Sequence, residues 1–140
     1  MYPLEKIEIS SKKELTEILA TTVMQRHMAK VSKTFSIEKA IFALAASNIS
    51  GAPVVDESNK LIGFISESDL LIQVSHKDKN EKVSFKESIL KVQDTMNLKE
   101  IVLFMSKNKL KVTPVVNSDN EVLGIISRMD LLKFIVNYKD

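Results

Sequence analysis

The sequence contains no cysteine, only three glycines and only two histidines. Without cysteine, the chain can form no disulfide and offers no thiol for catalysis or for a metal ion. The glycines stand far apart, at positions 51, 63 and 124, so they form no glycine-rich phosphate loop. The histidines, His27 and His76, lie in no metal-ligand pattern such as H-E-x-x-H. These absences argue against an enzyme and against a metal site.

The sequence also lacks a charge excess and a long apolar run. Its 20 basic and 18 acidic residues are interleaved and give a formal charge of +2, which disfavours nucleic acid as a partner. No apolar stretch approaches the ~20 residues that span a bilayer, and the first ten residues have no signal-peptide core. We therefore expect no membrane partner and a cytoplasmic location. The 44% hydrophobic and 27% charged residues are a globular balance.

What the sequence does contain is an internal repeat. A shift of 61 residues aligns residues 30–71 with residues 91–132 without a gap, and 13 of the 42 aligned pairs are identical. Each copy has a short extended piece, a helical pattern that starts at Ser36 or Asn97, two Val- and Ile-rich strands around a polar turn, and a closing helix. The sequence therefore predicts an α/β (α+β) protein with two β-α-β-β-α repeats packed sheet to sheet.

The predicted boundaries follow from this repeat. Residues 1–21 form a lead-in segment with a helix, and residues 22–74 form the first repeat. The polar, charged residues 75–82 form a linker, and residues 83–140 form the second repeat. Neither repeat of about 50 residues can bury enough surface to stand alone, so the two should pack as one globule. Pro53 and Pro114 are expected at the first residue of a strand, where a missing N–H is tolerated.

A Ser-x-x-Asp motif ends the last predicted strand of each copy, as Ser66 to Asp69 and as Ser127 to Asp130. One interpretation is structural: the serine caps the following helix, and the aspartate returns a hydrogen bond to the cap. The other is a nucleotide half-site. Backbone N–H groups at a helix start favour phosphate, and a carboxylate can accept hydrogen bonds from the two hydroxyls of a ribose. The four residues alone fit both interpretations.

The two copies resemble the CBS domain, the small module named after cystathionine β-synthase. The resemblance rests on "APVVDESNKLIGFISESDLL" and "TPVVNSDNEVLGIISRMDLL", which fit the family's h-P-V-V-[DN], turn, h-h-G-h-h-[ST]-x-x-D-[LI]. It covers roughly residues 20–136. It implies a tandem pair, often called a Bateman module, whose repeats pack through their sheets about a pseudo-twofold axis. Such pairs form clefts for adenosine-containing ligands: AMP, ADP or ATP, or sometimes S-adenosylmethionine or NAD.

The resemblance also implies a set of ligand residues. The family's ribose-binding aspartate corresponds to Asp69 and Asp130, and its phosphate-contacting serine or threonine to Ser66 and Ser127. Arg128 offers a cation for phosphate where the first copy has Glu67, so the Arg128 side is expected to bind phosphate better. The candidate ligand residues are Ser50, Ala52, Pro53, Ser66, Asp69, Thr113, Pro114, Ser127, Arg128 and Asp130.

The function expected from these observations is a regulatory, allosteric module without catalytic activity. It would bind an adenine nucleotide in clefts between the repeats and relay occupancy to an effector protein. It would require no cofactor, and it would form a homodimer, the four-repeat disc common in the family. The alternative is a structural dimerisation module with no physiological nucleotide, in which Ser-x-x-Asp acts only as a helix cap.

Overall fold

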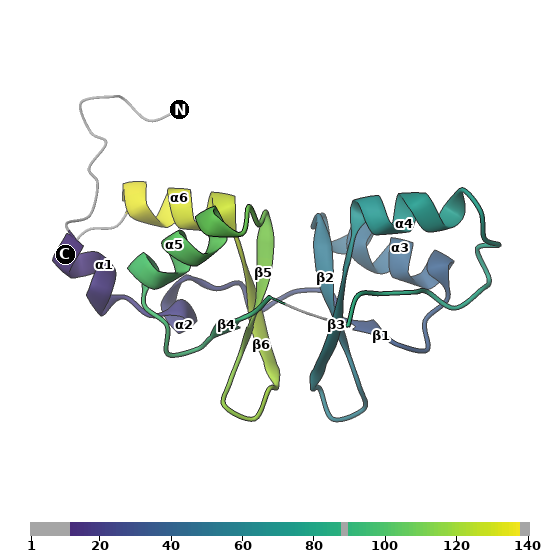
Figure 1. The fold of residues 1–140 in the computed structure, drawn as a ribbon, viewed down its shortest axis with the longest axis horizontal. Coiled ribbons are helices and arrows are strands. Elements are labelled where there is room, and N and C mark those ends of the chain that lie inside the picture. Colours follow the sequence, from purple (N-terminus) through teal and green to yellow (C-terminus); the bar gives the residue numbers. More distant parts are fainter. Residues whose placement is uncertain (1–11, 88–89, 138–140) are drawn as a thin grey trace.

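The computed structural model describes residues 12–87 and 90–137, which form two copies of one arrangement placed side by side (Figure 1). Two helices precede the repeats: α1 (Lys12–Glu17) and α2 (Ala20–Val23). The first repeat consists of β1 (Val31–Ser32), α3 (Ile37–Ser47), β2 (Gly51–Val55), β3 (Leu61–Ser66) and α4 (Glu67–Val74). The second consists of β4 (Val92–Gln93), α5 (Leu98–Lys107), β5 (Val112–Val116), β6 (Val122–Ser127) and α6 (Arg128–Asn137). The predicted order of strands and helices is confirmed in both copies.

Each repeat has its own three-stranded sheet, in the orders β1-β2-β3 and β4-β5-β6. The two-residue strands β1 and β4 run parallel to the middle strands β2 and β5. The middle strands form antiparallel hairpins with β3 and β6. The prediction for Pro53 was wrong, because Pro53 is the third residue of β2. It is tolerated there because β1 pairs only with Val54 and Val55, so no β1 residue is paired with the proline. Pro114 has the same position in β5, where β4 pairs only with the two valines that follow it.

The two sheets face each other, and the two main helices of each repeat lie on the outer side of its sheet (Figure 1). Each repeat therefore has a separate apolar core between its helices and its sheet. Ile37, Leu44 and Ile65 belong to the first core, and Ile101 and Ile126 belong to the second. A smaller apolar cluster joins the repeats, where Leu61, Val116 and Val122 pack together.

The segment before each repeat packs on the opposite repeat. Gln25 exchanges two backbone hydrogen bonds with Ile125 of β6, at 2.9 and 3.0 Å. At the position 61 residues later, Lys86 accepts a backbone hydrogen bond from Phe64 of β3 at 3.3 Å. The sequence grouped these segments with the repeats that they precede, but in the structure they cover the exposed edge of the other repeat's sheet, where backbone groups need partners.

Gly63 and Gly124 allow this close approach. A Cβ on Gly63 would meet the ring of Phe85 at 2.1 Å, and a Cβ on Gly124 would meet the carbonyl oxygen of Gln25 at 2.6 Å. Both distances are far shorter than a carbon contact, so any side chain would push the crossing segment away. The conserved spacing of these glycines within the two copies therefore reflects packing of the exchanged segments.

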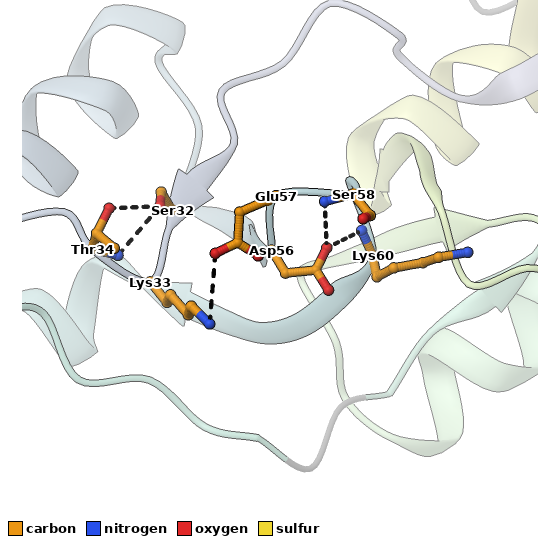
Figure 2. A network of polar contacts seen from close by, with 7 residues as sticks. All are labelled: Ser32, Lys33, Thr34, Asp56, Glu57, Ser58 and Lys60. Atoms are coloured by element: carbon orange, nitrogen blue, oxygen red, sulfur yellow. Dashed lines mark hydrogen bonds and ion pairs between the residues drawn. The ribbon is translucent and has the colours of Figure 1, made fainter.

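The turn of each hairpin is built by the residue that follows Pro-Val-Val. In the first repeat, Asp56 Oδ1 accepts hydrogen bonds from the backbone N–H groups of Ser58 and Lys60, both at 2.9 Å (Figure 2). In the second repeat, Asn117 Oδ1 accepts the equivalent bonds from Asp119 and Glu121, both at 3.0 Å. Aspartate and asparagine suit this position because each offers an oxygen to its own turn.

An asparagine in each turn joins the two repeats. Asn59 and Asn120 both have left-handed backbones, with φ of 64°. The side-chain amide of Asn59 donates to the carbonyl of Val122, and that of Asn120 donates to the carbonyl of Leu61, both at 3.0 Å. Backbone bonds run beside them, from the Leu61 N–H to the Asn120 carbonyl and from the Val122 N–H to the Asn59 carbonyl, at 3.0 and 3.1 Å. The pseudo-twofold relation of the repeats is thus fixed by four reciprocal hydrogen bonds.

We predict that Asn59→Ala lowers the free energy of unfolding by about 2 kcal/mol, measured by urea denaturation. The substitution leaves the Val122 carbonyl without its donor and places alanine in a left-handed conformation. Asn59→Gly is the control, because glycine adopts that conformation without strain and should lose only about 1 kcal/mol. An unchanged unfolding free energy for Asn59→Ala would show that the exchange does not hold the repeats together.

Candidate functional site

Both Ser-x-x-Asp motifs form a capping box at a strand-to-helix turn. Ser66 ends β3 in extended conformation, and its Oγ accepts the Asp69 N–H at 3.1 Å while its own N–H donates to Asp69 Oδ2 at 3.0 Å. In the second repeat, Ser127 Oγ accepts the Asp130 N–H at 3.0 Å, and the Ser127 N–H donates to Asp130 Oδ2 at 2.9 Å. The structural interpretation of the motif is therefore realised at both turns.

The cap uses only one oxygen of each aspartate. Asp69 Oδ1 lies 4.0 Å from the ammonium nitrogen of Lys86, and the Asp69 side chain is 24% exposed. Asp130 Oδ1 accepts a hydrogen bond of 2.7 Å from the side-chain amide of Gln25. Lys86 and Gln25 are equivalent positions on the two exchanged segments. Each aspartate thus caps its helix with Oδ2 and presents Oδ1 to the segment that crosses from the other repeat.

A cleft lies beside Ser66, and both repeats contribute to it. It consists of two adjoining cavities of about 630 and 240 Å³, and the larger one lies within the usual size range of ligand pockets. The larger cavity is lined by Ser50, Phe64, Ser66, Glu67, Ser68, Leu71, Lys109, Leu110, Lys111 and Val112. The smaller is lined by Phe64, Ser66, Asp69, Lys86, Leu90, Leu110, Val112 and Pro114. We call the two together the first cleft.

The first cleft has three chemically distinct parts. Phe64, Ser66, Leu110 and Val112 line both cavities and so form its middle. Asp69, Lys86, Leu90 and Pro114 line the smaller end, where a carboxylate and an ammonium lie against apolar surface. Lys109 and Lys111 line the larger end, together with Glu67 and Ser68. A mainly apolar wall with a few convergent polar groups is the usual construction of a small-molecule site.

Each repeat has one further cavity, which lies between its two main helices. One, of about 330 Å³, is lined by residues of α3 and α4 such as Ile41, Leu44 and Leu71. The other, of about 400 Å³, is lined by residues of α5 and α6 that include Arg128 and Leu132. The two occupy equivalent positions under the 61-residue shift, and both are grooves between apolar helix faces.

The structure brings together only part of the predicted ligand set. Ser50, Ser66, Asp69 and Pro114 line the first cleft. Arg128 lines the groove between α5 and α6, next to Lys109. The other predicted residues lie outside these four cavities: Ala52, Pro53, Thr113, Ser127 and Asp130.

Ala52 and Thr113 lie in the interior. Both side chains have an exposed fraction of 0%, and Ala52 is part of the first repeat's core. They alternate along β2 and β5 with Pro53 and Pro114, so they point to the opposite face of the sheet. Their assignment to a ligand site stays a prediction that this arrangement does not favour.

Sequence reasoning missed Phe64, Lys86, Leu90 and Lys109. Phe64 belongs to the strand just before Ser66, and the other three come from segments that reach the first cleft only because the two repeats pack together. The 61-residue shift offered one signal, because Lys86 and Lys109 replace Gln25 and Asn48 of the other copy. The shift could not show where those charges lie in space.

Residues 12–87 and 90–137 contain neither a candidate metal-binding cluster nor a candidate membrane-spanning helix. Within these ranges no three His, Asp or Glu side chains lie close enough together to hold a metal ion. None of the helices in the described part of the chain is both long and apolar enough to cross a bilayer.

Comparison with known proteins identifies one matching family. The sequence model described as CBS domain matches residues 19–76 and residues 84–137, which together make up most of the chain.

Curated relatives include two proteins of Methanocaldococcus jannaschii. The uncharacterized protein MJ1232 is 34% identical over 91 residues, which cover 65% of this chain and 30% of that protein. The inosine-5′-monophosphate dehydrogenase is 29% identical over 114 residues, which cover 81% of this chain and 23% of that enzyme. The chain therefore spans less than a third of the length of either relative.

Solved structures share the fold. CBSX2 in complex with AMP has a TM-score of 0.72 and 24% identity, with 83% of this chain and 94% of that chain covered. The CBS domain pair of MJ0100, in complex with 5′-methylthioadenosine and S-adenosyl-L-methionine, has a TM-score of 0.73 and 22% identity, with 91% and 96% covered. The cytosolic domain of the Mg²⁺ channel MgtE, in complex with ATP, has a TM-score of 0.74 and 23% identity, with 86% and 50% covered.

Because Asp69 Oδ2 accepts the hydrogen bond of the cap, substitutions of Asp69 should change the free energy of unfolding. Asp69→Ala removes the acceptor for the Ser66 N–H and should lower the free energy of unfolding by about 1 kcal/mol. Asp69→Asn keeps an oxygen that can accept this bond, so its loss should be about half as large or less. Urea denaturation of the two variants measures the difference. Equal losses would mean that the negative charge, and not the hydrogen bond, stabilises the helix start.

Proposed function

Because the chain belongs to the CBS domain family, we propose that it is a regulatory module that binds an adenosine-containing ligand between its two repeats. The observation that carries the proposal is the first cleft, where Asp69 lines the smaller cavity, caps α4 through Oδ2 and has Oδ1 outside the cap, near Lys86. A carboxylate oxygen so placed can accept hydrogen bonds from the vicinal hydroxyls of a ribose. The family membership and the AMP, ATP and S-adenosyl-L-methionine bound by the three structural neighbours support an adenosine ligand.

The first cleft offers a partner to each part of a nucleotide. The ribose lies at Asp69, and the base packs against apolar side chains of the smaller cavity, such as Leu90 and Pro114. The phosphate lies at the start of α4, where Ser66 and Ser68 supply hydroxyl groups and the helix dipole favours negative charge. These groups position and bind a ligand, and the proposed role is binding with no catalysed reaction.

Ligand binding can change how the two repeats are oriented, because residues of both repeats line the first cleft. Ser66 and Asp69 belong to the first repeat, whereas Leu110 and Val112 belong to the second. A ligand in contact with both stabilises one mutual orientation of the repeats, to the extent of its differential affinity for that orientation. The proposed output is recognition of that orientation by an effector protein. No cofactor is needed, and the location is cytoplasmic, as it is for the cytosolic domain of MgtE.

A homodimer completes the proposal. Leu71 and Leu132 occupy equivalent positions on α4 and α6 and are 71% and 56% exposed. Each borders the apolar groove between the helices of its repeat. Two grooves related by a pseudo-twofold axis form a self-complementary surface, which a second copy of the chain can cover by a twofold rotation. Such a dimer has the four repeats of the expected disc.

Isothermal titration calorimetry tests ligand binding. The protein should bind at least one of adenosine, AMP, ADP, ATP and S-adenosylmethionine. Asp69→Asn should weaken that binding about tenfold, because asparagine has no second, charged oxygen to accept hydrogen bonds from the ribose hydroxyls. Asp56→Asn is the matched control: it makes the same substitution in a turn whose counterpart already has Asn117. If none of these compounds binds with a dissociation constant below ~1 mM, the structural dimerisation module becomes the better account.

Sedimentation velocity tests the dimer. The wild-type chain should sediment as a dimer, and Leu132→Glu should shift it to a monomer, because a charge in the helix groove would be buried without a partner. Lys133→Glu, at the exposed next position of α6, introduces the same side chain outside the groove and should leave the dimer intact. A monomeric wild-type chain at micromolar concentration, or a dimeric Leu132→Glu variant, would contradict this interface.

A further inference from the structure

The first cleft and its counterpart in the second repeat differ in charge. The first cleft contains Lys86, Lys109 and Lys111. Under the 61-residue shift, the equivalent residues are uncharged: Asn48, Gln25, which donates to Asp130, and Ser50, which itself lines the first cleft with Lys111. The first cleft thus has a lysine at three positions whose equivalents are uncharged, and the opposite change occurs at Glu67, whose equivalent is Arg128. Glu67 and Asp69 are the carboxylates of the first cleft, so cations outnumber anions there.

Lys109 has a left-handed backbone conformation, which asparagine adopts more readily than lysine. Its φ is 53°, in the left-handed region, and that of its counterpart Asn48 is 50°. A lysine retained at some conformational cost, with its side chain lining the larger cavity, is consistent with a role for its charge.

The backbone of the crossing segment is held near Lys86 by a buried side chain. The side-chain amide of Gln73, 7% exposed, donates to the Ser84 carbonyl and accepts the Ser84 N–H, both at 2.8 Å. Val83, the residue before Ser84, is buried in the first repeat's core. The crossing segment is thus fixed two residues before Lys86, whose side chain is 78% exposed and whose ammonium nitrogen lies 4.0 Å from Asp69 Oδ1. Part of the negative charge at the ribose position is thereby balanced.

The equivalent position in the second repeat, beside Ser127 and Asp130, differs in its contacts. The oxygen of Asp130 that would face a ribose already accepts the amide of Gln25 at 2.7 Å. A ligand at this position would have to displace that hydrogen bond. Phe64, which lines both cavities of the first cleft, is replaced by Ile125, which is 2% exposed. In the second repeat, the outer oxygen of the aspartate is therefore already hydrogen-bonded, and no aromatic ring stands at the position of Phe64.

From these differences we infer that the first cleft is the ligand site and that its ligand is a nucleoside polyphosphate, a di- or triphosphate. The inference rests on the proposed function and specifies its site and ligand class. The ribose lies at Asp69 and the first phosphate at Ser66, and the outer phosphates reach Lys109 and Lys111 at the larger end. Lysine ammonium groups are strong partners for phosphate oxygens. Arg128, the cation that the sequence favoured, lines the groove between α5 and α6, which Lys109 also borders, but it does not line the first cleft.

The test compares adenosine, AMP, ADP and ATP by isothermal titration calorimetry. The wild-type chain should bind one ATP per chain, about tenfold or more tightly than AMP. The double variant Lys109→Asn, Lys111→Ser carries the residues of the other repeat and should lose this preference while its AMP affinity changes by no more than about twofold. The double variant Lys99→Gln, Lys107→Gln removes two exposed lysines of α5 outside the cleft; it is the charge-matched control and should keep the preference. The preference should also weaken as salt is raised.

The outcomes separate this inference from the proposed function. Equal affinity for AMP and ATP overturns the polyphosphate assignment, and an ATP preference that survives in the Lys109→Asn, Lys111→Ser variant overturns the role of Lys109 and Lys111. Both outcomes leave adenosine binding intact. Loss of ATP binding in Asp130→Asn but not in Asp69→Asn overturns the choice of cleft. Absence of binding by all four compounds defeats the proposed function itself. Circular dichroism and thermal unfolding of each variant identify any loss of fold, and the single variants Lys109→Asn and Lys111→Ser then carry the test.

Discussion

The structure depends on the reciprocal hydrogen bonds that Asn59 and Asn120 make across the pseudo-twofold axis. Each asparagine donates to a strand carbonyl of the other repeat, and Lys30 and Lys91 donate to their side-chain oxygens, both at 2.8 Å. These four residues are two of the identical pairs of the duplicated sequence. Because the bonds fix how one sheet lies against the other, they also fix the distance between Ser66 and the second repeat's residues that complete the cleft.

The Ser-x-x-Asp motif serves the helix and the cleft with different atoms of one carboxylate. Oδ2 of Asp69 accepts the N–H of Ser66, and this bond holds the aspartate in the orientation that leaves Oδ1 facing outward. Cap and ligand group are therefore compatible, and the cap pre-orients the group that a ribose would meet. Preorganisation of this kind lowers the entropy lost on binding. Asp130 caps its helix in the same way, but its Oδ1 accepts a hydrogen bond from Gln25. The two motifs therefore differ in the partner of this second oxygen.

The sequence predicted those features whose partners are near in the chain. The duplicated strand and helix order, the caps at Ser36 and Asn97, and the Ser-x-x-Asp turns all involve residues within about four positions. It could not predict that Gln25 meets Asp130, since 105 positions separate them and the crossing segments leave no local pattern. The direction of Ala52 was also hidden, because β2 is buried on both faces and shows no polar alternation.

The central claim is that one ligand contacts both repeats within the first cleft. Titration of isotopically labelled protein with ATP, followed by backbone amide chemical shifts, tests it most directly. The account predicts that shift changes concentrate together at residues 66–69 of the first repeat and residues 109–112 of the second, with small changes at residues 127–130. Changes confined to residues 127–130, or the absence of changes at either half of the first cleft at saturating ATP, would contradict it.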